Sequence, residues 1–198
     1  MSTTPYVYDR LPPFEYRLRK RTTMLVVHDS KTTPEAVKPL EVLRWAARQQ
    51  GMLDIGYHIV IDRDGCFHLL RPLDRMGCHA AGYNDESIGL CMLGGLNAAG
   101  ERANNFTRVQ MTALQGAACA FLHEYRPIEP EARVIGLKEL GGYRKKSDSP
   151  ALDMRALRAF LIERRVQRVP ILSQLLKRGD VRRVTPSRID PELPQEGP

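Results

Sequence analysis

Short apolar runs alternate along the chain with segments whose apolar residues recur at helical spacing. Helical spacing extends over residues 37–50, 107–125 and 153–166, and Thr107 stands where a helix N-cap is expected. The strand-like runs are TMLVVH (residues 23–28), GYHIVI and CFHLL on either side of the turn DRDG, SIGLCMLGG, and RVIGL. Strands and helices that alternate in this way predict an α/β (mixed α+β) layer structure.

The two ends of the chain lack this periodicity. We expect an N-terminal arm at residues 1–21, a folded domain at 22–166 and an extended basic tail at 167–198. Of the net charge of +7, residues 1–154 contribute only +2, from 20 Lys and Arg against 18 Asp and Glu. Residues 155–188 contribute +8 and the last ten −3. A nearly neutral domain makes nucleic acid an unlikely partner.

Two further classes of protein are disfavoured by the pattern. No apolar run approaches the roughly 18 residues that span a bilayer, and the N-terminal residues do not resemble a secretory signal peptide. The sequence therefore predicts synthesis in the cytoplasm without a signal peptide, and no membrane span. The four cysteines have no C-x-x-C spacing, so we expect them to be reduced.

Four segments carry candidate chemistry in a recognisable order: LVVHDS, LRWAARQQGMLDIGYHIVIDRDG, GCHAAGYNDESIGLCMLGG and NNFTRVQMTAL. Together they resemble the zinc-dependent N-acetylmuramoyl-L-alanine amidases, most closely the lysozyme-amidases of short-tailed phages, in a group that includes animal peptidoglycan recognition proteins. The resemblance covers residues 24–160. It implies a central mixed β-sheet of about five or six strands flanked by helices, with a metal cleft on one face.

The resemblance also implies a zinc ion held by two histidines and by a cysteine or aspartate, with one position open for a water molecule that the metal activates. His28 matches the first ligand, and Asp148 matches the aspartate form of the third, although another register places Ser149 there. The second histidine position is Leu137, which has no lone pair to donate. We therefore expect an incomplete metal site and no cofactor, with zinc only if the chain is an active amidase. Glu139 is the alternative replacement ligand.

Other matched positions are retained. Tyr57 matches the tyrosine beside the attacked carbonyl, and Lys145 or Lys146 matches the lysine thought to stabilise the oxyanion. Packing within a strand explains Tyr57 about as well as catalysis does. His79 and Asn84 are candidates for lining the cleft, or for hydrogen bonding within their own loop.

Three functions follow as alternatives. Leu137 favours an amidase-like pseudoenzyme, a binding or structural component of a phage virion whose tail docks on a protein partner and whose cleft binds peptidoglycan weakly. The second alternative is an active N-acetylmuramoyl-L-alanine amidase, an endolysin. The third is a phage regulator that binds RNA polymerase. The residues expected to contact a protein partner are Leu172, Leu175, Leu176, Arg182, Arg183 and Arg188.

Overall fold

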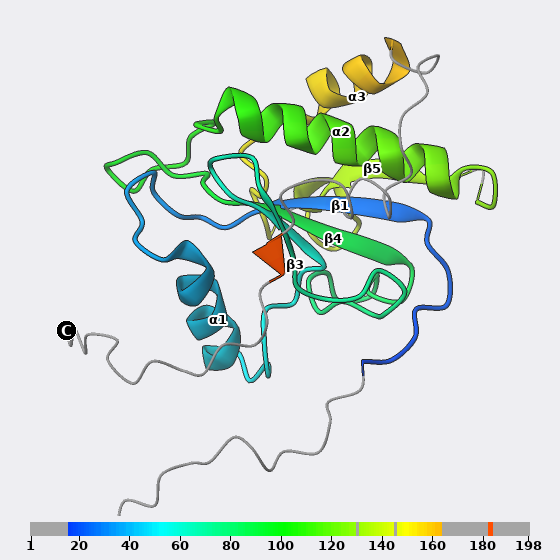
Figure 1. The fold of residues 1–198 in the computed structure, drawn as a ribbon, viewed down its shortest axis with the longest axis horizontal. Helices are drawn as coiled ribbons and strands as arrows, with labels where there is room; N and C mark the ends of the chain where they lie inside the picture. Colours follow the sequence, from blue (N-terminus) through cyan, green and yellow to red (C-terminus); the bar gives the residue numbers. More distant parts are fainter. Residues whose placement is uncertain (1–15, 130, 145, 164–181, 184–198) are drawn as a thin grey trace, which may run out of the picture.

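A mixed six-stranded sheet forms the centre of the computed structural model, which describes residues 16–129, 131–144, 146–163 and 182–183 (Figure 1). The strands, in the spatial order β5-β1-β4-β2-β3-β6, are β1 (Met24–Asp29), β2 (Ile59–Ile61), β3 (Phe67–Leu69), β4 (Ser87–Met92), β5 (Arg133–Gly136) and β6 (Arg182–Arg183). The α-helices are α1 (Pro39–Gln49), α2 (Arg108–Tyr125) and α3 (Met154–Glu163). The predicted fold class is confirmed.

Strand β1 lies inside the sheet, in parallel with β4 on one side and β5 on the other. Strand β2 continues the parallel series beside β4, and β3 returns antiparallel to it through the predicted hairpin. Gly65 in this turn has a φ of 81°, which glycine adopts without strain. Because the carboxyl ends of parallel strands meet at one edge, residues at the end of β1 lie where such sheets usually carry their sites.

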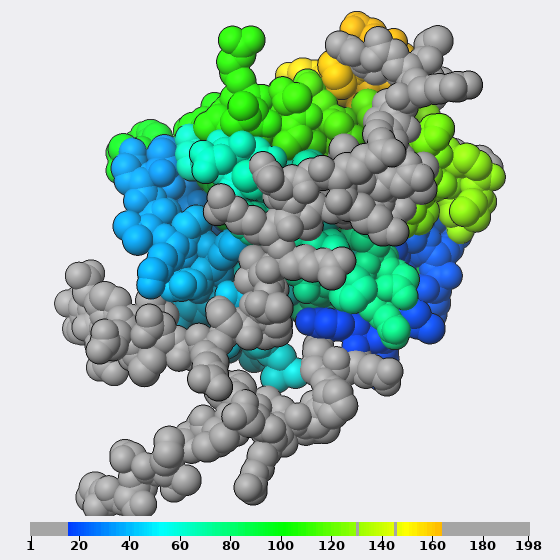
Figure 2. Space-filling model, in the orientation of Figure 1, coloured from blue at the N-terminus to red at the C-terminus, as the bar shows by residue number. Residues whose placement is uncertain are grey.

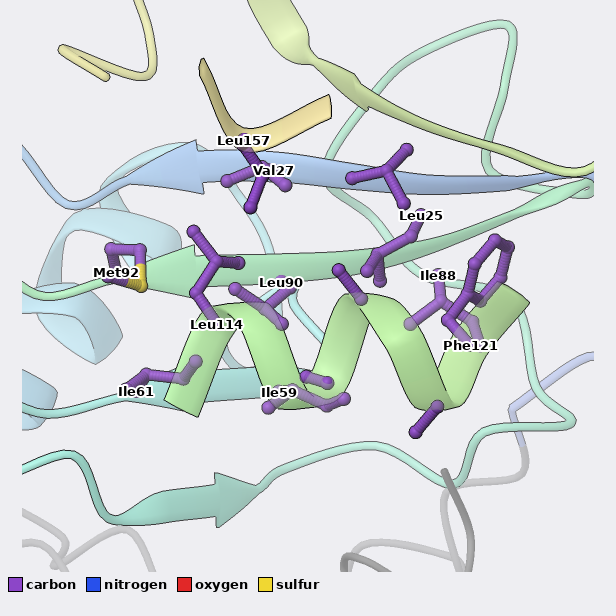
Figure 3. Close-up of a cluster of buried hydrophobic side chains, with 14 of the residues drawn as sticks. Leu25, Val27, Ile59, Ile61, Ile88, Leu90, Met92, Leu114, Phe121 and Leu157 are labelled. Atoms are coloured by element: carbon purple, nitrogen blue, oxygen red, sulfur yellow. The ribbon is translucent and has the colours of Figure 1, made fainter. Parts of the chain in front are cut away.

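The two faces of the sheet have different partners. Leu25 and Val27 of β1 point to the face that α2 covers, where they join the side chains from β2, β4 and α2 shown in Figure 3. Val26 and His28 alternate with them and point to the opposite face. On that face, Leu40 and Leu43 of α1 pack against a buried cluster of β2 and β4 residues. His28 is therefore on the face away from α2.

Helix α2 begins as the sequence predicts. The Thr107 hydroxyl accepts a hydrogen bond from the Gln110 backbone amide, and the Gln110 side chain accepts one from the Thr107 amide. This reciprocal capping box satisfies two amides that the first turn would otherwise leave unpaired. Helix α3 lies beyond α2, on the side of the molecule away from α1 (Figures 1 and 2).

The predicted boundaries need small corrections. Helix α1 starts at Pro39 rather than residue 37, because proline is accommodated in the first turn of a helix. The expected third helix is described only to Glu163. Arg182 and Arg183 form a short strand beside β3 of their own chain, which the tail prediction did not include. No helix within the described residues is long and apolar enough to cross a membrane.

Candidate active site

His28 lies near the carboxyl end of β1 and is 1% exposed. Its ring stands beside two others, with centroids 4.9 Å from that of Tyr57 and 5.1 Å from that of His79. Nε2 of His28 lies 3.0 Å from Nδ1 of His79, a hydrogen bond between the two imidazoles. Burial lowers the pKa of His28 to about 3 and holds that of His79 well below its usual range, so both rings are neutral at pH 7.

His79 reaches this place because two glycines make room for its ring. A Cβ on Gly77 would lie 2.4 Å from Cδ2 of His79, and one on Gly89 would lie 2.5 Å from it. The loop backbone is held by Asn84, whose Oδ1 accepts hydrogen bonds from the amides of His79 and Ala80. Of the two predicted cleft residues, His79 contacts His28, and Asn84 shapes the loop that carries it.

Tyr57 is the predicted catalytic residue that lies nearest to His28. It precedes β2, and burial holds the pKa of its hydroxyl well above the usual 10, so the group remains a hydrogen-bond donor at neutral pH. The two alternative lysines are not brought into this cluster. Lys146 is exposed, and Lys145 falls outside the described residues.

The position of the second histidine ligand has no metal-binding side chain. Leu137 packs, partly buried, against an apolar cluster that includes Val26 and Leu140. Glu139, considered as a replacement ligand, instead accepts two hydrogen bonds from the Arg158 guanidinium, at 2.8 and 2.9 Å, and one from the Gly136 amide. Its carboxylate is therefore already engaged.

The third ligand position is also occupied by other interactions. The Asp148 side chain is 53% exposed, and its oxygens lie 2.8 Å from Nζ of Lys31 and 2.9 Å from Nε of Arg102. The hydrogen bond from Lys31 is the main cause that lowers the pKa of Asp148. Ser149 is buried, and its hydroxyl accepts a hydrogen bond from the Asp29 amide.

These contacts decide whether the family's zinc fits. Among the residues that the structure describes, no three His, Cys, Asp or Glu side chains are grouped to hold a metal ion. A hydrolytic zinc needs three protein ligands, and of the three positions here one is leucine and one is bound in ion pairs. The described residues do not fit a zinc ion held in the family's manner.

Sequence reasoning did not find two charged residues beside this cluster. Asp29 directly follows His28, and its buried carboxylate binds the guanidinium of Arg102. The two residues are separated by 73 positions. Nothing in the local pattern around either residue indicates their pairing, although a carboxylate that ends a buried strand is itself a signal that a cation lies nearby.

A model of the N-acetylmuramoyl-L-alanine amidase family matches residues 18–150. The chain belongs to this amidase family. The chain is 38% identical over 121 residues to the endolysin of Enterobacteria phage K11, an alignment that covers 61% of this chain and 78% of that protein. It is 37% identical over 111 residues to the endolysin of Escherichia phage T7, an alignment that covers 56% of this chain and 74% of that protein.

Solved structures of amidases have the same fold. N-acetylmuramoyl-L-alanine amidase LysC from Clostridium intestinale superimposes with a TM-score of 0.57 at 23% identity, covering 75% of this chain and 95% of that one. This likeness supports the fold alone. The predicted family resemblance is therefore confirmed by the family match and by the fold.

The first functional interpretation is wrong on these findings. A pseudoenzyme that serves as a virion component is contradicted by the similarity to phage endolysins, which favours the alternative of an active amidase. The prediction gave too much weight to Leu137. Leu137 is a single position and concerns only the binding of a metal ion. The similarity to endolysins extends over more than half of the chain.

The predicted partner surface is mostly outside the described residues. Leu172, Leu175, Leu176 and Arg188 lie there, and of the others only the backbone of Arg182–Arg183 is described, paired with β3. Docking of the tail on a protein partner stays a prediction.

Proposed function

We propose that this chain is an active N-acetylmuramoyl-L-alanine amidase, which hydrolyses the amide bond between N-acetylmuramic acid and L-alanine in peptidoglycan. The observation that carries the proposal is the similarity to phage endolysins over about three-quarters of their length. Its substrate class, peptidoglycan, is the one that the family name states.

The side chains around His28 suit an amide substrate in two respects. The Tyr57 hydroxyl stays protonated at neutral pH, so it can donate a hydrogen bond to the carbonyl oxygen as negative charge develops there. The imidazoles of His28 and His79 stay neutral, the form that accepts a proton. The low pKa of both imidazoles makes them weak bases, so they do not by themselves explain how a water molecule is activated. Hydrolysis is therefore measured both with added zinc and with a chelator.

The decisive experiment incubates the purified full-length chain with peptidoglycan sacculi, with equimolar zinc in one arm and EDTA in another. Cleavage of this bond creates a new α-amino group on L-alanine, which amine labelling and mass spectrometry detect. We expect new L-alanine amines in at least one arm. Sacculi that are bound but yield no such amines in either arm would overturn the proposal of hydrolysis.

A variant pair tests the role of Tyr57. Tyr57→Phe removes only the hydroxyl, and loss of one donor to a developing oxyanion typically lowers the rate on the order of 100-fold. Tyr125→Phe, at the far end of α2, is the matched control and should retain the wild-type rate. Equal rates of hydrolysis for the two variants would show that the Tyr57 hydroxyl takes no part in the reaction.

A further inference from the structure

Four charged side chains meet beside the carboxyl end of β1. The side chain of Asp29 has no exposed surface, and its two oxygens accept hydrogen bonds from the Arg102 guanidinium, at 2.6 and 3.2 Å. Nε of Arg102 lies 2.9 Å from Asp148, whose other oxygen lies 2.8 Å from Nζ of Lys31. Two carboxylates thus alternate with two cations, and the formal charges balance.

The same residues bind the backbone of the loop at residues 147–151. The Ala151 amide donates to Oδ2 of Asp29 at 2.5 Å, and the Asp29 amide donates to the Ser149 hydroxyl at 2.9 Å. Arg102 also donates to the Asp148 carbonyl, at 3.3 Å. The loop is therefore tied to β1 both through its backbone and through its side chains.

The surrounding backbone is shaped to this ion pair. Gly95 has a φ of 98°, and a Cβ there would lie 2.8 Å from Cγ of Asp29 and 3.0 Å from Nη1 of Arg102. The Gly95 carbonyl accepts a further hydrogen bond from Arg102, at 3.0 Å. Any other residue at this position would be strained and would press on the pair.

A third cation, Lys138, holds the far end of the loop. Nζ of Lys138 donates to the carbonyls of Pro150 and Leu152, at 2.8 and 3.2 Å. The Lys138 amide also donates to the Ser149 carbonyl, at 2.7 Å. Lys138 directly follows Leu137, so the segment expected to supply a metal ligand supplies a loop anchor instead.

We infer that the network of Asp29, Arg102, Asp148 and Lys31 closes loop 147–151 onto β1, in the structural role that a metal ion fills when its ligands come from both segments. A metal would cross-link β1 to this loop through coordination; here a guanidinium and its carboxylates form the cross-link. Removing either partner of a bidentate pair with a fully buried carboxylate is strongly destabilising, because the other charge is then left uncompensated. The inference goes beyond the proposed function, since loop closure is measured without substrate.

The first test is a double-mutant cycle on the full-length chain. Arg102→Gln and Asp29→Asn should each lower Tm on the order of 10 °C, and the double variant should lower it by clearly less than the sum. Arg21→Gln, which breaks only exposed ion pairs with Glu86 and Glu131, is the control and should shift Tm by no more than about 2 °C. Additive effects in the cycle would overturn the inference.

The second test measures loop closure directly by amide hydrogen exchange. Arg102→Gln should accelerate exchange at the Ala151 amide by about tenfold or more, while the core amides of α2 keep their protection. If that variant does not fold, Lys31→Met is used instead, because it removes only the half-exposed end of the network. It should accelerate amide exchange in the loop by a smaller factor. Unchanged exchange in the folded variant would refute closure by these charges.

Measurements on the wild-type chain with added zinc or EDTA separate this inference from the amidase proposal. In the wild-type chain, neither EDTA nor equimolar zinc should change Tm or the exchange of the Ala151 amide. Zinc that protects the loop, with the protection reversed by EDTA, would show that a metal performs the closure. Hydrolysis of peptidoglycan can be found or lost without altering either result.

Discussion

His58 is fully buried on the same face of the sheet as His28, and both of its ring nitrogens are in use. Nδ1 accepts a hydrogen bond from the Gly89 amide at 2.9 Å, and Nε2 lies 2.8 Å from the Arg75 carbonyl, so Nε2 carries the proton. A second proton would have no acceptor and would stand beside the Arg19 guanidinium. Burial, above all, lowers the pKa of His58 to about 3.

We therefore predict that acid destabilises the fold partly through His58. Its folded pKa lies below the unfolded value of about 6.5, so the unfolded chain binds the proton first. The stabilisation is complete above about pH 6.5 and is lost as the pH falls towards 3, by up to about 1.4 kcal/mol per pH unit for one proton. Urea unfolding between pH 7.5 and 4.5 measures this slope.

The control for this prediction is His58→Gln, which cannot titrate. The variant should be less stable at every pH, because buried hydrogen bonds are lost. Its unfolding free energy should vary less steeply with pH, by the amount that corresponds to about one proton fewer bound on unfolding. His28 and His79 still titrate in the variant, so part of the slope should remain. An unchanged slope would assign the acid sensitivity to other groups.

At the scale of the element, α2 is anchored by a residue that serves two purposes. Gln110 is buried, and besides completing the capping box with Thr107, its Nε2 donates to the carbonyls of Leu93 and Ile61, at 2.9 and 3.4 Å. Those carbonyls lie at or just beyond the ends of β4 and β2. The N-terminus of the helix is thus fixed to the sheet edge by hydrogen bonds as well as by apolar packing.

We predict a graded loss of stability at this anchor. Thr107→Ala should lower the free energy of unfolding by about 1 kcal/mol, since one cap is lost. Gln110→Ala should cost more, about 1–3 kcal/mol, because it also leaves buried carbonyls without a donor. Thr112→Ala, on the exposed side of the same helix, should change stability by no more than about 0.5 kcal/mol. Urea unfolding of the three variants checks the order, and equal losses for all three would contradict it.

The elements that the sequence predicted well are those whose signal is local. The apolar run ending in His28 and the cap at Thr107 each report on a few neighbouring residues, and the structure places β1 and α2 there. The contacts between His28 and His79, and between Asp29 and Arg102, depend on chain segments 51 and 73 residues apart. Local periodicity carries no information on such pairings, so the sequence could not show which charges pair around loop 147–151.

At the scale of the whole molecule, the sheet ends in a strand from the far end of the sequence. Strand β6, Arg182–Arg183, pairs in parallel with His68 and Leu69 of β3. Among the described residues, the main buried apolar cluster extends no further along the chain than Leu161. Within the described part of the chain, this cluster is built without β6, and the backbone of β6 covers the edge of β3.

This arrangement leads to a prediction for a chain that lacks residues 167–198. The truncated domain should still unfold cooperatively, with Tm lowered by only a few °C, because a two-residue strand contributes few hydrogen bonds of about 1 kcal/mol each. Deletion of residues 184–198 alone, which keeps β6, is the matched control and should leave Tm unchanged. An uncovered edge strand offers unpaired backbone groups to another chain, so the longer truncation should also self-associate at concentrations where the control stays monomeric, as sedimentation velocity measures. Loss of cooperative unfolding would instead make residues 167–198 a required part of the domain.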